Sequence, residues 1–172
     1  MISQFKIENT TAEDLEFIYE LFDLSVKYQE SKGYPTWKNY DKEALIKDVE
    51  NKNQYKVMVD SQPGIIFSVR YSDKIIWREM DQEDAIYLHR IVVNPVFKGL
   101  KLFGEILSWA IDQAKQKRLK SIRMDTWANN PKIIEYYTGF GFRFIENYTT
   151  SNSLELPAHN RNLALTLLEL TL

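Results

Sequence analysis

The sequence predicts an α/β protein, in which helices cover the faces of a mixed β-sheet. Segments with the apolar patterns of strands are interleaved with segments whose apolar residues recur every three to four positions, as they do in helices. Because the 172 residues include only six glycines and five prolines, the turns between these segments are easy to place. This length suits one domain with its own core, so we expect residues 1–172 to form a single domain.

The chain is expected to begin with a strand at residues 4–8, followed by a long helix. Thr10 and Glu13 have the spacing of a capping box, which predicts a helix start at this point. Gly33 and Pro35 interrupt the helical pattern and end it. The apolar residues of this helix that would face the core are Leu15, Ile18, Phe22 and Val26.

The middle of the chain is predicted to contain a short helix and three strands. The helix covers about residues 42–50. Strands at 54–60 and 64–71 are joined by the sequence SQPG, whose proline and glycine are typical of a hairpin turn. A further strand is expected from Ala85 to Val93, after an acidic turn.

The best-defined helix of the sequence follows this strand, because its apolar residues form one continuous stripe. After it comes a strand at 121–127 and then a helix with Asn130 as its N-cap and Pro131 at its first position. Gly139 and Gly141 end that helix. In the helix that follows the strand from Ala85 to Val93, the apolar stripe consists of Phe103, Ile106, Leu107, Ala110, Ile111 and Ala114.

Two strands are predicted to complete the sheet. The first covers residues 143–150, and the second lies in the sequence LALTLLELTL at the C-terminus. In the second strand leucine occupies every second position in the first half, and it does so again in the second half after a shift of one residue. A bulge near Leu167 would reconcile the two registers.

Composition excludes several classes of function. The formal net charge is −2, so the chain lacks the basic field that nucleic-acid binding requires. Cysteine is absent, which excludes disulfides, thiolate metal sites and a cysteine nucleophile, and suits a reducing cytoplasm, where we expect the protein. No apolar run approaches the roughly 18–20 residues that span a bilayer, and no secretory leader is visible. We therefore expect no nucleic acid, membrane or metal among the partners.

Two strand–turn–helix motifs lie between Leu88 and Phe142. They read LHRIVVNPVFKGLKLFGEIL and IRMDTWANNPKIIEYYTGFGF. Together they resemble the GNAT superfamily of N-acetyltransferases, which move an acetyl group from acetyl-coenzyme A to an amine. The predicted order of elements matches this family over nearly the whole chain. The resemblance implies a mostly antiparallel central sheet of about six or seven strands with helices on both faces.

The resemblance also implies that the first motif binds acetyl-coenzyme A. Residues 93–95 match the end of the family's strand, and Lys98 stands where the family has arginine or glutamine. Lys101 and Phe103, however, replace two residues that are usually small. The first turn of a helix offers free N–H groups and a partial positive charge, so a diphosphate can bind there without special side chains. The implied cofactor-binding residues are Ile91, Val92, Val93, Lys98, Gly99, Leu100, Lys101, Leu102, Phe103, Asn130 and Tyr137.

Acetyl transfer needs a proton donor for the departing thiolate and a stabilised oxyanion. The resemblance implies that Tyr137 lies beside the coenzyme sulfur and is the donor, since a phenol keeps its proton at pH 7. The alternative is that Tyr137 is one of several core aromatics. The resemblance also implies that main-chain N–H groups of Val92 or Val93 stabilise the oxyanion.

The amine must also lose a proton, and His89 is the candidate base. An imidazole titrates near pH 6.5, which suits this role, and some arylalkylamine-type members of the family carry a histidine at the matching place. The alternative is a histidine buried in the sheet with both nitrogens satisfied. Glu83, Asp84 and His159 are the competing candidates.

The acceptor is not identified by the sequence. In the family it usually contacts the first two helices and their connection, which here contains Tyr34, Trp37 and Tyr40; Trp127 follows a strand end on the same side. Aromatic faces suit a cationic amine, although the same rings can simply fill the core. A small primary amine or an exposed amino group is therefore expected as the acceptor.

These observations predict an N-acetyltransferase that works by direct attack in a ternary complex, because no cysteine is present to carry the acetyl group. The alternative is a catalytically silent module that binds an acyl-coenzyme A or a protein partner. Lys101 and Phe103 favour this alternative. A homodimer formed through the C-terminal strands is also compatible with the pattern.

Overall fold

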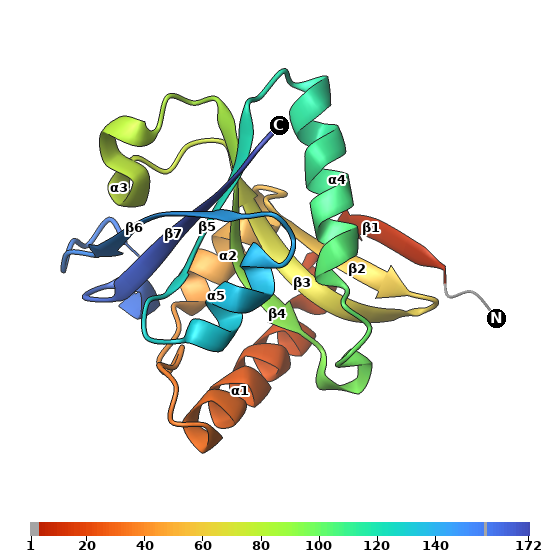
Figure 1. Ribbon diagram of the computed structural model, residues 1–172. Coiled ribbons are helices and arrows are strands. Elements are labelled where there is room, and N and C mark those ends of the chain that lie inside the picture. Colours follow the sequence, from red (N-terminus) through yellow and green to blue (C-terminus); the bar gives the residue numbers. More distant parts are fainter. Residues whose placement is uncertain (1–3, 157) are drawn as a thin grey trace.

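A seven-stranded sheet forms the centre of the protein (Figure 1). The computed structural model describes residues 4–156 and 158–172. Across the sheet the strands lie in the order β1-β2-β3-β4-β5-β7-β6, with β4 and β5 parallel and all other described neighbours antiparallel. The predicted mixed, mostly antiparallel sheet is thereby confirmed. The strands are β1 (Phe5–Asn9), β2 (Gln54–Val59), β3 (Gln62–Arg70), β4 (Ala85–Val93), β5 (Ser121–Trp127), β6 (Arg143–Thr149) and β7 (Ala164–Thr171).

Helices cover both faces of this sheet. On one face, α1 (Leu15–Ser31) and α2 (Lys42–Glu50) pack over β3 and β4, and the short α3 (Lys74–Trp77) packs over β4 and β7. On the other face lie α4 (Phe103–Gln116) and α5 (Pro131–Thr138) (Figure 1). No helix in the described part of the chain is long and apolar enough to cross a membrane.

The predicted apolar stripe fixes the position of α4. Phe103, Ile106 and Ala110 are buried against side chains of β3, β4 and β5, and Ile111 packs at the margin of the same cluster. Burying a large apolar side chain stabilises the fold by about 1.5–3 kcal/mol. The stripe therefore holds the first turn of α4 firmly at the end of β4.

The first helix begins one residue later than predicted. Thr11 is the N-cap of a single 3-10 turn, Ala12–Asp14, that leads directly into α1. The backbone N–H of Thr11 donates to the Asp14 carboxylate at 2.7 Å. Thr10 is buried instead, and its hydroxyl donates to Oε1 of Gln54 at 2.9 Å. The predicted pairing of Thr10 with Glu13 is therefore wrong by one position.

Two local features differ from the sequence prediction. The hairpin turns at residues 60–61, where Asp60 adopts a φ of 54°, whereas the predicted SQPG turn begins at Ser61 and runs into β3. The helix α3 was not predicted; Asp73 caps it by accepting from the Ile76 N–H at 3.3 Å. Four residues are too few to produce a helical repeat, so the sequence pattern gives no sign of α3.

The two leucine registers at the C-terminus are the two faces of β7. Leu165 and Leu167 pack with the cluster under α3, while Leu168 packs with the cluster under α4. A strand buried on both faces needs no bulge to explain this pattern. The predicted irregularity near Leu167 does exist, but the extra residue is Ile145 on the neighbouring strand β6.

The strand β4 contains an extra residue relative to β3. His89 pairs with Ser68 and Val92 pairs with Ile66, so two residues of β4 oppose one residue of β3 between these pairs. Arg90, inside this bulge, has a φ of 49°. A bulge bends the strand and redirects its side chains.

On its other edge β4 separates from β5. The parallel pairing of the two strands ends at Leu88 and Met124. Both strands continue beyond this point, β4 to Val93 and β5 to Trp127. The divergence leaves backbone and side chains of both strands facing a gap in the middle of the sheet, and this gap is where the candidate site lies.

Candidate functional site

A cavity with a volume of about 780 Å³ opens where β4 and β5 diverge. Its walls come from α1, β4, the loop before α4, β5 and α5. The structure brings all but one of the predicted catalytic and cofactor-binding residues to this cavity. The exception is Leu100, which does not line it and whose side chain is 52% exposed.

Unpaired amides lie beside the cavity at the start of α4. The backbone N–H groups of Gly99, Lys101, Leu102 and Phe103 donate no hydrogen bond to any described residue. Gly99 and Lys101 adopt left-handed backbone conformations, with φ of 97° and 52°. Left-handed residues next to right-handed ones turn successive N–H groups toward one side and form a concavity for anions. With the partial positive charge of the helix terminus, this loop suits a diphosphate.

Phe103, which replaces a usually small residue, packs into the core. Its side chain is only 2% exposed, and its ring centroid lies 4.9 Å from that of Tyr137 and 5.0 Å from that of Phe140. The phenylalanine therefore supports one wall of the cavity and leaves a volume of about 780 Å³ open.

Lys98 provides a cation beside the same loop. Its Nζ lies 4.6 Å from the ring centroid of Tyr28 on α1, as in a cation–π contact. The ammonium group has no carboxylate partner within 4.0 Å among the described residues. It is therefore free to pair with an anionic group in the cavity.

The helix α5 brings Asn130 and Tyr137 to one wall. Oδ1 of Asn130 accepts from the Ile133 N–H at 3.3 Å and caps the helix, as predicted. Tyr137 follows seven residues later, which is two helical turns, so both residues lie on the same side of α5. Both line the cavity.

Tyr137 is suited to keep its proton. Its side chain is buried, and the hydroxyl donates to no described residue. Burial raises the pKa of the phenol above its usual value, and Tyr136 and the charge of Asp125 raise it further. The hydroxyl is consequently a proton donor throughout the neutral pH range.

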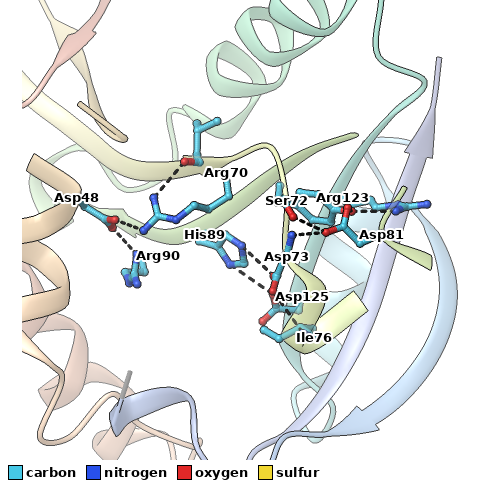
Figure 2. A network of polar contacts seen from close by, with 12 residues as sticks. Asp48, Arg70, Ser72, Asp73, Ile76, Asp81, His89, Arg90, Arg123 and Asp125 are labelled. Atoms are coloured by element: carbon cyan, nitrogen blue, oxygen red, sulfur yellow. Dashed lines mark hydrogen bonds and ion pairs between the residues drawn. The ribbon is translucent and has the colours of Figure 1, made fainter. Parts of the chain in front are cut away.

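His89 lies beside two carboxylates (Figure 2). Its Nε2 is 3.2 Å from Oδ2 of Asp73, and its Nδ1 is 3.5 Å from Oδ1 of Asp125. The imidazole comes from β4, Asp125 from β5, and Asp73 from the loop before α3. All three side chains are at least 86% buried, because 12–14% of their surface is exposed. The imidazole thus lies at ion-pair distance from two buried carboxylates.

This arrangement changes the titration of both His89 and Asp125. Burial and the charge of Arg90 act to lower the pKa of His89, but the contact with Asp73 and the charges of Asp73 and Asp125 outweigh them and raise it. Burial raises the pKa of Asp125 to about 6, even though the charge of His89 acts in the opposite direction. His89 therefore holds a proton to a higher pH than a free histidine, and Asp125 titrates near neutral pH.

Asp81 positions the loop that carries Asp73. Its carboxylate accepts from the Ser72 hydroxyl at 2.7 Å, from the Asp73 N–H at 2.7 Å and from the Tyr87 hydroxyl at 2.8 Å (Figure 2). These hydrogen bonds hold the pKa of Asp81 below its usual range, against the effect of burial. The position of Asp73 beside His89 is therefore fixed by a second polar network.

A second ion cluster lies next to His89. The fully buried carboxylate of Asp48 accepts from the Ser68 hydroxyl at 2.7 Å. It also forms ion pairs with Arg70 and Arg90 (Figure 2). Sequence reasoning missed these residues together with Asp73 and Asp125. The signal was a charge inside an apolar pattern: Asp48 shares the buried face of α2 with Leu45 and Val49, and Asp125 lies in the interior of SIRMDTW.

The competing candidates for the base lie elsewhere. Glu83 is exposed and forms an ion pair with Lys74 at 3.2 Å, while Asp84 pairs with Lys120 at 3.0 Å. Neither carboxylate lines the cavity. The side chain of His159 lies outside the described part of the structure.

The aromatic residues predicted for the acceptor divide into two groups. Tyr34, Trp37 and Trp127 line the cavity, and the rings of Trp37 and Trp127 lie 5.7 Å apart. Tyr40 instead packs on Phe22 at 4.9 Å between ring centroids, and its hydroxyl donates to Asp23 at 3.0 Å. Tyr40 therefore fills the core next to α1.

Asp73, His89 and Asp125 each offer a potential metal ligand, and these atoms lie within 4.8 Å of one another. The expectation that the protein uses no metal therefore stays a prediction.

Comparison with known proteins agrees with this geometry. The profile of the acetyltransferase (GNAT) family matches residues 26–142. The uncharacterized N-acetyltransferase YesJ of Bacillus subtilis is 24% identical over 163 residues, which cover 84% of this chain and 91% of that protein. An uncharacterized N-acetyltransferase of Methanocaldococcus jannaschii is 23% identical over 147 residues, covering 83% of this chain and 62% of that protein.

Solved structures share the fold over its full extent. A GNAT family acetyltransferase from Listeria monocytogenes superposes with a TM-score of 0.76 at 18% identity, covering 100% of this chain and 99% of that one. A putative acetyltransferase from Salmonella typhimurium, solved with its cofactor acetyl-coenzyme A, gives a TM-score of 0.65 at 17% identity, covering 97% and 93%. The fold is thus shared with these solved acetyltransferases. The chain belongs to the acetyltransferase (GNAT) family.

The backbone of Lys101 leads to a first prediction. A side chain at a φ of 52° strains the backbone by about 1 kcal/mol, which glycine avoids. We expect Lys101→Gly to raise the melting temperature by about 2–4 °C, measured by differential scanning calorimetry. Lys101→Ala is the matched control, because it removes the charge and keeps the strain. An equal gain in both variants would attribute the effect to the charge and contradict the prediction.

Proposed function

We propose that the protein transfers an acetyl group from acetyl-coenzyme A to the nitrogen of an amine, by direct attack within a ternary complex. The observation that carries this proposal is one cavity with unpaired amides at the start of α4 and with Tyr137 and His89 in its walls. Membership of the GNAT family supports acetyl transfer. The acetyl-coenzyme A in the solved Salmonella protein supports the choice of donor.

The residues around the cavity fit this donor. The four unpaired amides between Gly99 and Phe103 suit the diphosphate, and Lys98 adds a positive charge beside them. The N–H of Asn94 donates to Gly64 on β3 at 2.8 Å. Because successive N–H groups of a strand point to opposite edges, the N–H of Val93 points away from β3 and toward the gap beside β5. Of the two predicted oxyanion donors, this geometry favours Val93 over Val92.

Tyr137 and His89 supply the two proton transfers that the reaction needs. When bound, acetyl-coenzyme A supplies a thioester carbonyl carbon as the electrophile. His89, held between Asp73 and Asp125, accepts the proton that the amine loses as its nitrogen bonds to this carbon. Tyr137 donates its hydroxyl proton to the sulfur as the carbon–sulfur bond breaks. The products are an amide, a free thiol, a protonated His89 and a deprotonated Tyr137, and proton exchange with solvent restores both side chains.

The alternative of a catalytically silent module is not supported by the residues that suggested it. Phe103 packs into the core beside Tyr137, and Lys101 leaves its backbone N–H unpaired at the start of α4. Neither substitution closes the cavity, whose volume is about 780 Å³. An enzyme is therefore the better interpretation.

Acetyl-coenzyme A should stabilise the folded protein. Ligand at 100 times its dissociation constant adds about 2.7 kcal/mol to the free energy of unfolding. For a chain of this size the melting temperature should rise by roughly 5–10 °C in a thermal shift assay. Adenosine, which lacks the diphosphate, is the control and should give a much smaller shift. The absence of any shift at millimolar acetyl-coenzyme A would contradict the proposal.

Removal of the Tyr137 hydroxyl should slow the reaction without weakening donor binding. We expect Tyr137→Phe to lower kcat at least about tenfold, because general acid catalysis typically contributes 10²–10⁴-fold. The thermal shift with acetyl-coenzyme A should stay unchanged, since the ring that packs on Phe103 is retained. Tyr136→Phe, on the same helix and 38% exposed, is the matched control. Wild-type kcat in Tyr137→Phe would assign the proton donation to another group.

The pH dependence should follow the charges around His89. Because the pKa of His89 is raised, the acidic limb of kcat/KM should lie above pH 6.5 when the acceptor amine stays protonated over the range. Asp73→Asn removes a charge that raises this pKa, so the limb should move to lower pH. Glu83→Gln removes an exposed carboxylate and should leave the limb in place. A limb that does not move in Asp73→Asn would exclude His89 as the base.

A further inference from the structure

A second cavity, with a volume of about 410 Å³, adjoins the first one at His89 and Arg90. Its walls come from α2, the end of β3, the loop before α3 and the segment before β7. These elements lie on the α2–α3 side of the sheet, whereas the unpaired amides belong to the start of α4 on the other side. The second cavity therefore reaches His89 from the α2–α3 side of the sheet, opposite the unpaired amides at the start of α4.

Arg90, in the wall of both cavities, has donors without acceptors. Its side chain is 90% buried, since 10% of its surface is exposed. Nη1 is paired with Asp48, but Nε is buried with no hydrogen-bond partner, and Nη2 donates to no described residue. Burial lowers the pKa of Arg90, against the opposing charge of Asp48. A buried donor left unpaired is unfavourable, so this guanidinium is suited to receive an anionic partner.

The groups around His89 differ from those around Arg90. Two guanidinium groups, of Arg70 and Arg90, share the single carboxylate of Asp48. Asp41 also faces Arg90, but one of its oxygens accepts from the Ala44 N–H at 3.1 Å and caps α2.

Around His89 the balance is reversed, because two carboxylates, of Asp73 and Asp125, surround one imidazole. The carboxylates around His89 and the unpaired donors of Arg90 therefore meet at two consecutive residues of β4, whose Cα atoms are about 3.8 Å apart.

We infer that the acetyl acceptor is an amino acid, with its amine at His89 and its carboxylate at Arg90. The inference rests on the proposed function. The amine and carboxylate of an amino acid are separated by one carbon atom, which suits two opposite charges on neighbouring residues. Arginine binds a carboxylate through two parallel N–H groups, and Nε and Nη2 are the adjacent donors that Arg90 leaves unused. Asp73 and Asp125 attract the ammonium group, and His89 accepts its proton.

The test compares amino acids with the amines that lack only the carboxylate. The pairs are L-phenylalanine with 2-phenylethylamine and L-leucine with 3-methylbutylamine, and thiol release from acetyl-coenzyme A is measured for each. We expect kcat/KM for each amino acid to exceed that of its amine by at least about tenfold, because a site built for a polar group discriminates against the analogue that lacks it. Equal values within both pairs, or higher values for the amines, would overturn the inference.

Variants of Arg90 locate the origin of this preference. Arg90→Gln should remove most of the difference within each pair, because KM should rise more for the amino acids than for the amines. Arg90→Lys keeps the charge beside Asp48 and loses the paired donors, so it should lower the preference even if Arg90→Gln does not fold. Lys47→Gln is the matched control, because Lys47 is an exposed cation in the wall of the same cavity. A preference that persists in Arg90→Lys, or disappears in Lys47→Gln, would contradict the role of Arg90.

The outcomes also separate this inference from the proposed function. If amines are acetylated and amino acids are not, acetyl transfer stands and the amino-acid acceptor is wrong. If no compound of either set releases thiol although acetyl-coenzyme A raises the melting temperature, transfer to small amines fails and the inference fails with it. If acetyl-coenzyme A produces no shift, the proposed function itself is wrong.

Discussion

The site depends on one extra residue in β4. Successive side chains of a regular strand point to opposite faces, yet His89 contacts Asp73 and Arg90 contacts Asp48, both from the α2–α3 side. The bulge makes this arrangement possible, with Arg90 in a left-handed conformation that costs about 1–3 kcal/mol. The same irregularity occurs where β4 leaves β5. The bulge in β4 therefore lies where the cavity opens, and it also places His89 and Arg90 in the cavity wall.

The buried charges around His89 and Arg90 are not explained by a contribution to the stability of the fold. A buried ion pair contributes little on balance, because the loss of hydration offsets much of the attraction. Here the balance is less favourable still, since the pKa of Asp125 is raised to about 6 and Nε of Arg90 has no partner. Perturbed ionisable groups that line a cavity are typical of functional sites. The polar network in Figure 2 is therefore better explained by chemistry than by stability.

The sequence predicted those parts of the site that depend on local pattern. The bounds of β4 and β5 and the start of α5 at Asn130 were correct because alternation, helical period and capping act over a few residues. The partners of His89 could not be predicted in this way. Asp73 precedes a helix of only four residues, and the pairing of Asp48 with Arg90 joins positions 42 residues apart in the chain. Such contacts follow from the three-dimensional arrangement of the sheet, which no local pattern encodes.

The unusual loop before α4 shows why side chains are a poor guide to a backbone site. The groups suited to a diphosphate are backbone amides. Binding therefore requires that the loop residues adopt suitable φ angles and expose their N–H groups, and it does not require particular side chains. Lys101 meets this requirement by adopting the conformation that glycine prefers, at a cost in strain, and Phe103 meets it by turning its ring into the core. Two substitutions that look disabling in the sequence are therefore compatible with the same backbone.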